Sequence, residues 1–176
     1  VIYAFAPYRF THYMHLELQI VFWIPLALLM IHRIISRGGT RDGVLFGVAV
    51  ACQVLSCIYS GIFLVLYCGM FVPLLFITTG GRRAGRVIVA LIAAAVVTAA
   101  VVSPYALAYL RAEAAVGTRD IETVRLYSAS LTNYLSAPAM SRLYGWKAIT
   151  NPTLADEMNL FPGIVAVVLA AVGAVA

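Results

Sequence analysis

The chain has 176 residues, of which 63% are hydrophobic and only 11% are charged. Soluble domains carry about 25% charged residues, so the composition excludes an ordinary soluble domain and predicts an all-α integral membrane protein. The net charge of +5 does not indicate nucleic-acid binding, because half of the 12 basic residues lie in two short loops, where membrane orientation explains them. The three cysteines lie in apolar segments without CxxC spacing and predict neither a zinc site nor a disulfide framework.

The first of about five expected spans covers residues 15–35, and Pro25 is predicted to kink it. Its outer end carries a polar cluster: Arg9, His12, His15, Glu17 and Gln19. On a helix both histidines and Gln19 would share one face, with Glu17 turned away and Arg9 as its candidate partner. Imidazoles at the mouth of a bundle could bind phosphate or transfer protons. A metal site, or plain hydrogen bonding to headgroups, is the alternative.

Residues 43–81 contain no charged side chain. A single helix of that length would measure about 58 Å, against a hydrocarbon core of roughly 30 Å. The chain is therefore expected to cross the membrane twice, over residues 43–59 and 62–78. Ser60-Gly61 is a plausible tight turn between these two spans.

Arginines flank this uncharged run on both sides: Arg33, Arg37, Arg41, Arg82, Arg83 and Arg86. Two crossings return the chain to its starting side, so both clusters face one compartment, and arginine-rich short loops favour the cytoplasm. The sequence thus predicts a multi-pass membrane protein, and its location in the bacterial cytoplasmic membrane is what the family resemblance described below implies. Loops 36–42 and 79–86 would be cytoplasmic, and segments 1–14 and 105–159 extracytoplasmic.

The fourth span is expected over residues 87–102, with a kink or an end at Ser103-Pro104. The predicted organisation is a four-span bundle over 1–104, an extracytoplasmic loop with short amphipathic helices over 105–159, and a truncated fifth span over 160–176. Because the last span is incomplete, the chain is expected to be a fragment of a longer protein.

Within the outer loop, the acidic residues from Asp120 to Glu122 predict the start of a helix that continues toward Leu135. Hydrogen-bonding and aromatic side chains gather there: Arg125, Tyr127, Ser128, Ser130, Thr132, Asn133 and Tyr134. They suit carbohydrate, and they suit an interfacial helix on lipid headgroups equally well. Asp156-Glu157 could supply a general base, or could simply mark the outer end of the last span.

Several motifs follow one another along the chain: Pro7-Tyr8-Arg9-Phe10-Thr11-His12, Ser60-Gly61-Ile62, Ser103-Pro104-Tyr105, Tyr127–Leu135, Tyr144-Gly145, and Glu157 ahead of Leu160-Phe161-Pro162-Gly163. In this order they resemble a group of large bacterial membrane proteins placed with the GT-C class of glycosyltransferases. The resemblance covers nearly the whole chain and depends on the order of the motifs rather than on any one of them.

The resemblance implies a multi-span enzyme that takes sugar from a polyprenyl-phosphate donor and transfers it to a carbohydrate or lipid acceptor on the outer face. No cofactor is evident, although a divalent metal is possible in the full-length protein. The resemblance implies functional roles for five residues: Arg9, His12, His15, Gln19 and Glu157. Of these, the two histidines and Glu157 are the candidate catalytic residues. Substrate binding is expected from Arg9, Glu17, Gln19, Arg125, Tyr134 and Tyr144.

The class usually carries a catalytic acidic residue in its first outer loop, which would lie upstream of Val1. Near Ser130, where relatives often have an acidic residue, this chain has only hydroxyls. A transporter or flippase and a non-catalytic membrane subunit are the alternatives. Transporters place ionisable groups near the bilayer midplane, whereas the spans between Gly43 and Val102 contain none beyond thiols and tyrosines.

Overall fold

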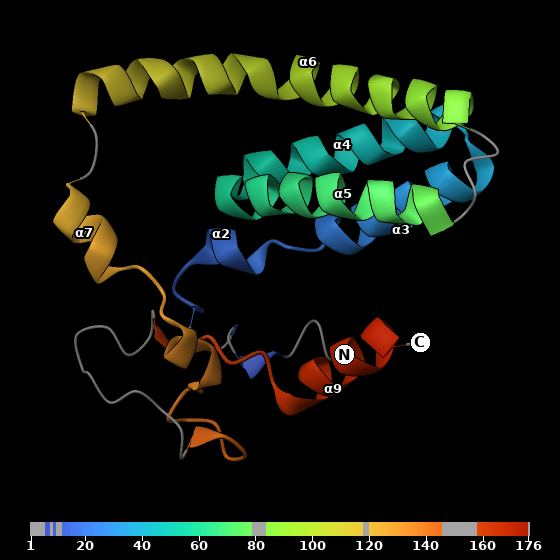
Figure 1. The fold of residues 1–176 in the computed structure, drawn as a ribbon. Helices are drawn as coiled ribbons and strands as arrows, with labels where there is room; N and C mark the ends of the chain where they lie inside the picture. The colour runs from blue at the N-terminus through green and yellow to red at the C-terminus, as the bar shows by residue number, and fades with distance from the viewer. Residues whose placement is uncertain are drawn as a thin grey trace. The chain divides into compact units, whose positions relative to one another are not determined.

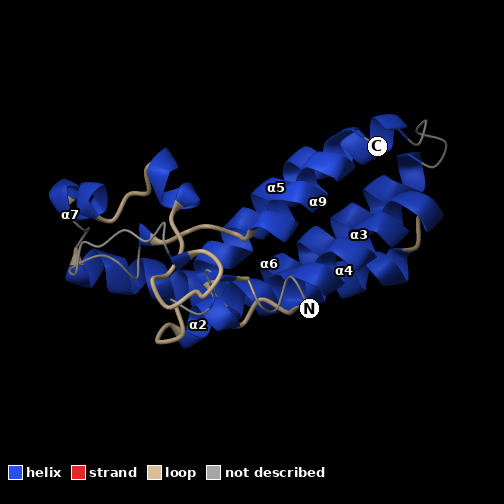
Figure 2. Ribbon diagram, turned by 90° about the horizontal axis from the view of Figure 1, so that it is seen from below, coloured by secondary structure: helices blue, strands red, loops and turns tan. Residues whose placement is uncertain are grey.

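The computed structural model describes residues 6–7, 9, 12–78, 84–117, 120–145 and 158–175. This part of the chain consists of helices and loops without strands, which confirms the all-α class (Figure 2). The chain divides into two compact units. The bundle unit is Ile20–Gly117, and the terminal unit combines Val1–Gln19 with Thr118–Ala176.

The bundle unit contains four helices: α3 (Trp23–Arg37), α4 (Thr40–Ser56), α5 (Ile58–Thr78) and α6 (Ala84–Val116). Helix α4 is central, because it packs against the other three (Figure 1). Buried apolar side chains at its contacts with its neighbours include Ile31, Ile34 and Val50. The core of this unit therefore surrounds α4.

Three segments are long and apolar enough to cross a membrane: Leu16–Arg37, Ile58–Ile77 and Ala84–Ala112. They support a membrane protein, but five spans are not confirmed. Helix α4, the expected second span, has 17 residues, and at about 25 Å it falls short of a hydrocarbon core of roughly 30 Å. At the expected fifth span, α9 (Ile164–Val175) has only 12 residues.

Two local features of the helices differ from the predictions. Helix α3 begins at Trp23, so Pro25, where a kink was predicted, lies in the first turn of the helix. A missing N–H there breaks no helical hydrogen bond. The turn between α4 and α5 is at Cys57, whose backbone is extended (φ −155°, ψ 109°), and not at Ser60-Gly61. Gly61 instead permits a close contact, since a Cβ there would lie 2.5 Å from Cγ2 of Val54.

Helix α6 does not end at Ser103-Pro104 but continues to Val116, with Pro104 inside it. From Arg86 to Ala106 the helix rises about 30 Å, which matches the thickness of a hydrocarbon core. A membrane-spanning α6 would therefore extend beyond that core at its C-terminal end. Tyr105 and Tyr109 lie at that boundary and are both exposed, as is typical of interfacial tyrosines.

Helices α4 and α6 run in the same direction and approach closely through small residues. A Cβ on Gly43 would lie 2.2 Å from the carbonyl oxygen of Ala90, and one on Gly47 would lie 2.5 Å from that of Ala94. The Thr98 hydroxyl donates a hydrogen bond to the Gly47 carbonyl at 3.1 Å. This is the close backbone contact that a Gly-x-x-x-Gly spacing permits between membrane helices.

The described basic residues on the two sides of the uncharged run lie at one end of the bundle. Arg33 Nη2 donates to Oδ1 of the buried Asp42 at 3.1 Å, which joins the end of α3 to the start of α4. Gly38 ends α3 with φ 70°, and a Cβ there would lie 2.8 Å from Cβ of Arg86 near the start of α6. The first arginine cluster and Arg86 thus lie at the same end of the bundle, as the predicted double crossing requires. Arg82 and Arg83, the other arginines of the second cluster, lie outside the described residues.

Gly47→Ala should destabilise the bundle, because the added methyl group meets the Ala94 carbonyl and must push α4 and α6 apart. Overpacking of this kind costs about 1–3 kcal/mol, which thermal unfolding of the purified protein in detergent would register as a lower midpoint. Gly69→Ala is the matched control, since a Cβ at Gly69 meets nothing within 4 Å and alanine favours the helix. Equal midpoints for the two variants would contradict the close contact.

Candidate functional site

The predicted site residues that the structure describes lie in the terminal unit. The regular elements among its described residues are α2 (Leu16–Gln19), α7 (Ile121–Leu126), the 3₁₀ helix η1 (Leu131–Leu135) and α9. Helix α7 begins after Asp120, as the acidic residues predicted. It ends at Leu126 rather than continuing to Leu135, and η1 forms a separate element.

The two histidines lie in a turn before α2 rather than on a helix face. The His15 N–H donates to the His12 carbonyl at 3.1 Å, and the ring centroids are 6.3 Å apart. The predicted helical face is therefore wrong, because the helix begins only at Leu16. The two imidazoles nonetheless stay close, with His12 buried and His15 exposed.

Arg9 and Gln19 hold this turn closed through reciprocal hydrogen bonds. Arg9 Nη2 donates to the Gln19 carbonyl, and Arg9 Nε donates to Gln19 Oε1 at 3.3 Å. In return, Gln19 Nε2 donates to the carbonyls of Arg9 at 3.1 Å and His12 at 2.9 Å. Both donors of the Gln19 amide are thus engaged within the segment. The immediate role of this pair is to fix the positions of the two histidines.

Glu17 is not turned away from both histidines, as a continuous helix would require. Its Oε1 lies 3.3 Å from Nδ1 of His15. The reason is that His15 precedes α2, so its ring reaches over the first turn of that helix. The two side chains are 46% and 54% exposed, so the pair is open to solvent. A carboxylate at Nδ1 orients an imidazole, an arrangement suited to general acid–base chemistry.

Asn133 is a buried connector that the sequence placed among possible carbohydrate ligands. Its Oδ1 accepts the Ser130 N–H at 2.6 Å, and its Nδ2 donates to the Met158 carbonyl at 3.1 Å. Its own carbonyl accepts the Leu160 N–H at 3.0 Å. Asn133 therefore joins η1 to the chain that precedes α9. The Ser-x-x-Asn spacing resembles a helix capping box, a signal that could have identified this structural role.

The segment 158–163 also contacts two other predicted motifs. The rings of Tyr144 and Phe161 pack edge to face with centroids 5.2 Å apart. Gly163 adopts φ 96°, and a Cβ there would lie 3.4 Å from Cδ of Pro7. This segment thus joins the N-terminal motif to the outer loop. Tyr144, a predicted substrate ligand, is partly buried by this packing.

The remaining predicted site residues have different surroundings. Arg125 donates to Glu122 Oε1 at 3.0 Å on the exposed face of α7, an i,i+3 surface pair of the kind that contributes little to stability. Tyr134 is 53% exposed and leaves its ring open to solvent or to a ligand. Glu157, a predicted catalytic residue, lies outside the described residues. The structure therefore gathers the N-terminal candidates around one turn, while Arg125 pairs within its own helix.

Within the described ranges, no group of three His, Cys, Asp or Glu side chains is placed to hold a metal ion. Comparison with known proteins gave no match: neither a family model, nor a curated protein, nor a solved structure corresponds to the chain. The function of the chain therefore has to be inferred from the geometry of the site and from the motifs of the sequence.

Asn133→Ala should loosen the terminal unit, because it leaves the Met158 carbonyl without its donor and removes the acceptor for Ser130. Loss of such buried hydrogen bonds costs about 1–3 kcal/mol. Amide hydrogen exchange at Leu160 and Phe161 should accelerate. Leu131→Ala, in the same 3₁₀ helix but with a side chain 87% exposed, should leave that exchange unchanged. Similar exchange in the two variants would show that Asn133 does not hold the unit together.

Proposed function

We propose that the chain is part of a bacterial membrane glycosyltransferase that transfers sugar from a polyprenyl-phosphate donor to a carbohydrate or lipid acceptor. The observation that carries this proposal is the composition of the terminal unit. The histidine-containing turn and the hydroxyl- and aromatic-rich loop fold into one unit, distinct from the apolar bundle. An acid–base pair in the same unit as such a loop suits chemistry on a polar substrate at a membrane surface.

The course of the chain through the bundle supports an extracytoplasmic site. The chain enters the bundle at Ile20, whose carbonyl accepts a hydrogen bond from Gln53 Nε2 at 2.9 Å near the C-terminal end of α4. It leaves at Gly117, after the C-terminal end of α6. Both junctions are at the bundle end away from the arginines. With the arginines in the cytoplasm, the terminal unit is joined to the bundle at its extracytoplasmic end.

The proposed chemistry is an inverting displacement at the anomeric carbon. His15, oriented by Glu17 at 3.3 Å, accepts the proton of the acceptor hydroxyl. The acceptor oxygen forms the new bond to the anomeric carbon as the bond to the lipid phosphate breaks. The phosphate departs with the bonding electron pair, and nearby cations stabilise its charge. Arg9 and Gln19 act as positioning residues that keep the histidine-containing turn closed.

In the full-length protein, His15→Ala should lower sugar transfer by about 100-fold or more, the usual contribution of a general acid–base group. The thermal midpoint should stay unchanged, because the His15 side chain is 46% exposed. Incorporation of radiolabelled sugar from a polyprenyl-phosphate donor into acceptor would measure the effect. His32→Ala is the matched control, since it removes an exposed histidine near the basic end of α3.

Normal transfer by His15→Ala would remove the histidine–glutamate pair from the mechanism. Accumulation of a labelled substrate in proteoliposomes without covalent transfer would favour a transporter instead. Gln19→Ala separates positioning from chemistry, because it opens the turn that holds both histidines. Its activity should fall together with protection of the residue 9–19 amides from hydrogen exchange, whereas His15→Ala should reduce activity alone.

A further inference from the structure

Exposed arginines lie at the end of the bundle where α3 ends and where α4 and α6 begin (Figure 1). Arg37 is in the last turn of α3, Arg41 in the first turn of α4 and Arg86 in the first turn of α6, and all three are exposed. The stem of Arg86 lies against the turn between α3 and α4, because a Cβ on Gly38 would be 2.8 Å from its Cβ and 3.4 Å from its Cδ. Arginines of three helices are thus found at one turn, and we call these three residues the arginine patch.

The bundle supplies no carboxylate that could neutralise this patch. Residues 18–112 contain a single acidic residue, Asp42. It is buried and pairs with Arg33 at 3.1 Å, so that arginine already balances its charge. The next acidic residue of the chain, Glu113, lies about 40 Å further along α6 than Arg86. Among the residues that the structure describes, none of the three patch arginines forms an ion pair. The patch therefore carries positive charge that nothing in the bundle compensates.

Two of the patch arginines lie at helix ends that are themselves positive. The N-terminus of a helix carries a partial positive charge, which disfavours cations in the first turn. Arg41 is the second residue of α4 and Arg86 is the third residue of α6. Helix α4 offsets this charge with Asp42, whereas α6 has no acidic residue in its first turn. An anion bound from outside the protein would stabilise both the arginines and the helix ends.

Exposed apolar side chains continue from the patch along the same helices. On α4, Leu45 and Val48 follow Arg41 at i+4 and i+7 and share its face, with exposed fractions of 41% and 39%. On α6, Val89 follows Arg86 at i+3 and is 54% exposed. A small soluble anion would leave these apolar side chains in water. A lipid would place its phosphate at the arginines and its acyl chains beside the apolar side chains.

We propose that the arginine patch binds the headgroup of an anionic diacyl phospholipid. The guanidinium groups donate charge-assisted hydrogen bonds to the phosphate oxygens, and the acyl chains lie along α4 and α6. Basic sites between membrane helices suit such headgroups, because each cation near the membrane surface adds to the attraction. The site is independent of the proposed sugar transfer, since all of its residues belong to the bundle unit.

The chain offers variants that change the charge of the patch and little else. Arg86→Gln removes the charge but keeps Cβ, Cγ and Cδ, the atoms that lie against Gly38. Arg41→Gln removes the charge of an exposed side chain on α4. Arg86→Lys keeps the charge and should retain the lipid. Arg111→Gln is the matched control, because Arg111 is an exposed arginine near the other end of α6.

Native mass spectrometry of the full-length protein in detergent would measure binding of phosphatidylglycerol and of phosphatidylcholine with identical acyl chains. The wild-type protein should bind phosphatidylglycerol more tightly. Arg41→Gln and Arg86→Gln should each lower the affinity for phosphatidylglycerol about fivefold, the usual contribution of one cation at an anionic membrane surface. Arg111→Gln should leave that affinity unchanged, and no variant should alter the affinity for phosphatidylcholine.

Three results would overturn the proposal. Equal affinity of the wild-type protein for the two lipids would show that the patch does not recognise a negative headgroup. An equal loss of phosphatidylglycerol in Arg111→Gln would show that the total charge, and not the patch, attracts the lipid. Displacement of phosphatidylglycerol by an equal concentration of inorganic phosphate would assign the patch to a soluble anion.

Discussion

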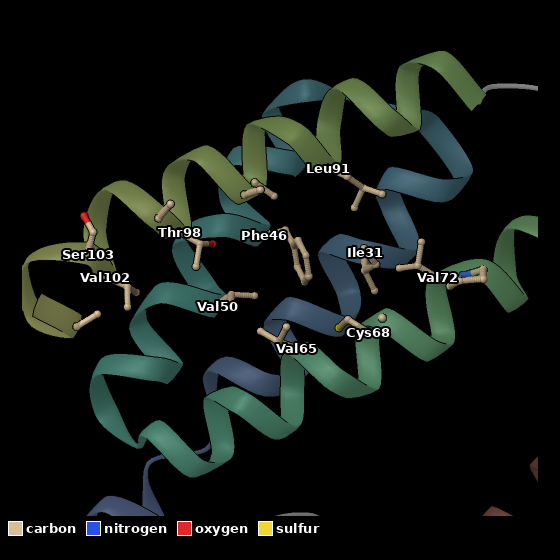
Figure 3. A pocket seen from close by; sticks show the side chains of 16 residues that line it. Ile31, Phe46, Val50, Val65, Cys68, Val72, Leu91, Thr98, Val102 and Ser103 are labelled. Carbon is tan, nitrogen blue, oxygen red and sulfur yellow. The ribbon is translucent and has the colours of Figure 1, made fainter. Parts of the chain in front are cut away.

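The bundle depends on the close approach of α4 and α6. In lipid, the hydrophobic effect does not drive helices together, so close van der Waals packing of backbones must do so. Gly43 and Gly47 allow this packing against Ala90 and Ala94. Because α4 also contacts α3 and α5, fixing α4 against α6 fixes the remaining helices. Phe46 and Val50 of α4 also line an apolar groove between α5 and α6 (Figure 3).

The terminal unit is held together differently, by hydrogen bonds between segments distant in sequence. Asn133 joins η1 to residues 158–160, and Gly163 approaches Pro7. A second set of bonds, between Arg9 and Gln19, closes the turn that carries the histidines. The bundle thus depends on glycines, whose lack of a side chain allows the backbones to approach. The terminal unit depends instead on polar side chains whose hydrogen bonds are formed within the unit.

Composition and apolar runs were sufficient to predict a helical membrane protein, and the acidic residues Asp120 and Glu122 located the start of α7. The local geometry was less predictable. Ser60-Gly61 has the residue types of a turn, yet Gly61 lies within α5 and allows a close contact with Val54 of α4. Only this packing distinguishes a turn glycine from a helix-contact glycine here. The predicted positions of the histidines were wrong because residues share a helix face only within a helix, and here the helix begins at Leu16, after both histidines. The Gly-x-x-x-Gly spacing of Gly43 and Gly47 is also present in the sequence, but the packing of α4 against α6 was not predicted from it.

Hydrogen bonds anchor the chain on both sides of the boundary between the two units, at Gln19 and at Ile20. Gln19 is tied into the terminal unit through Arg9 and His12, while the next residue, Ile20, is tied to Gln53 in the bundle. A single peptide bond therefore joins two anchored points. The hydrogen bonds that close the histidine-containing turn and the hydrogen bond that anchors the chain ahead of α3 therefore involve consecutive residues, with no unanchored residue between them.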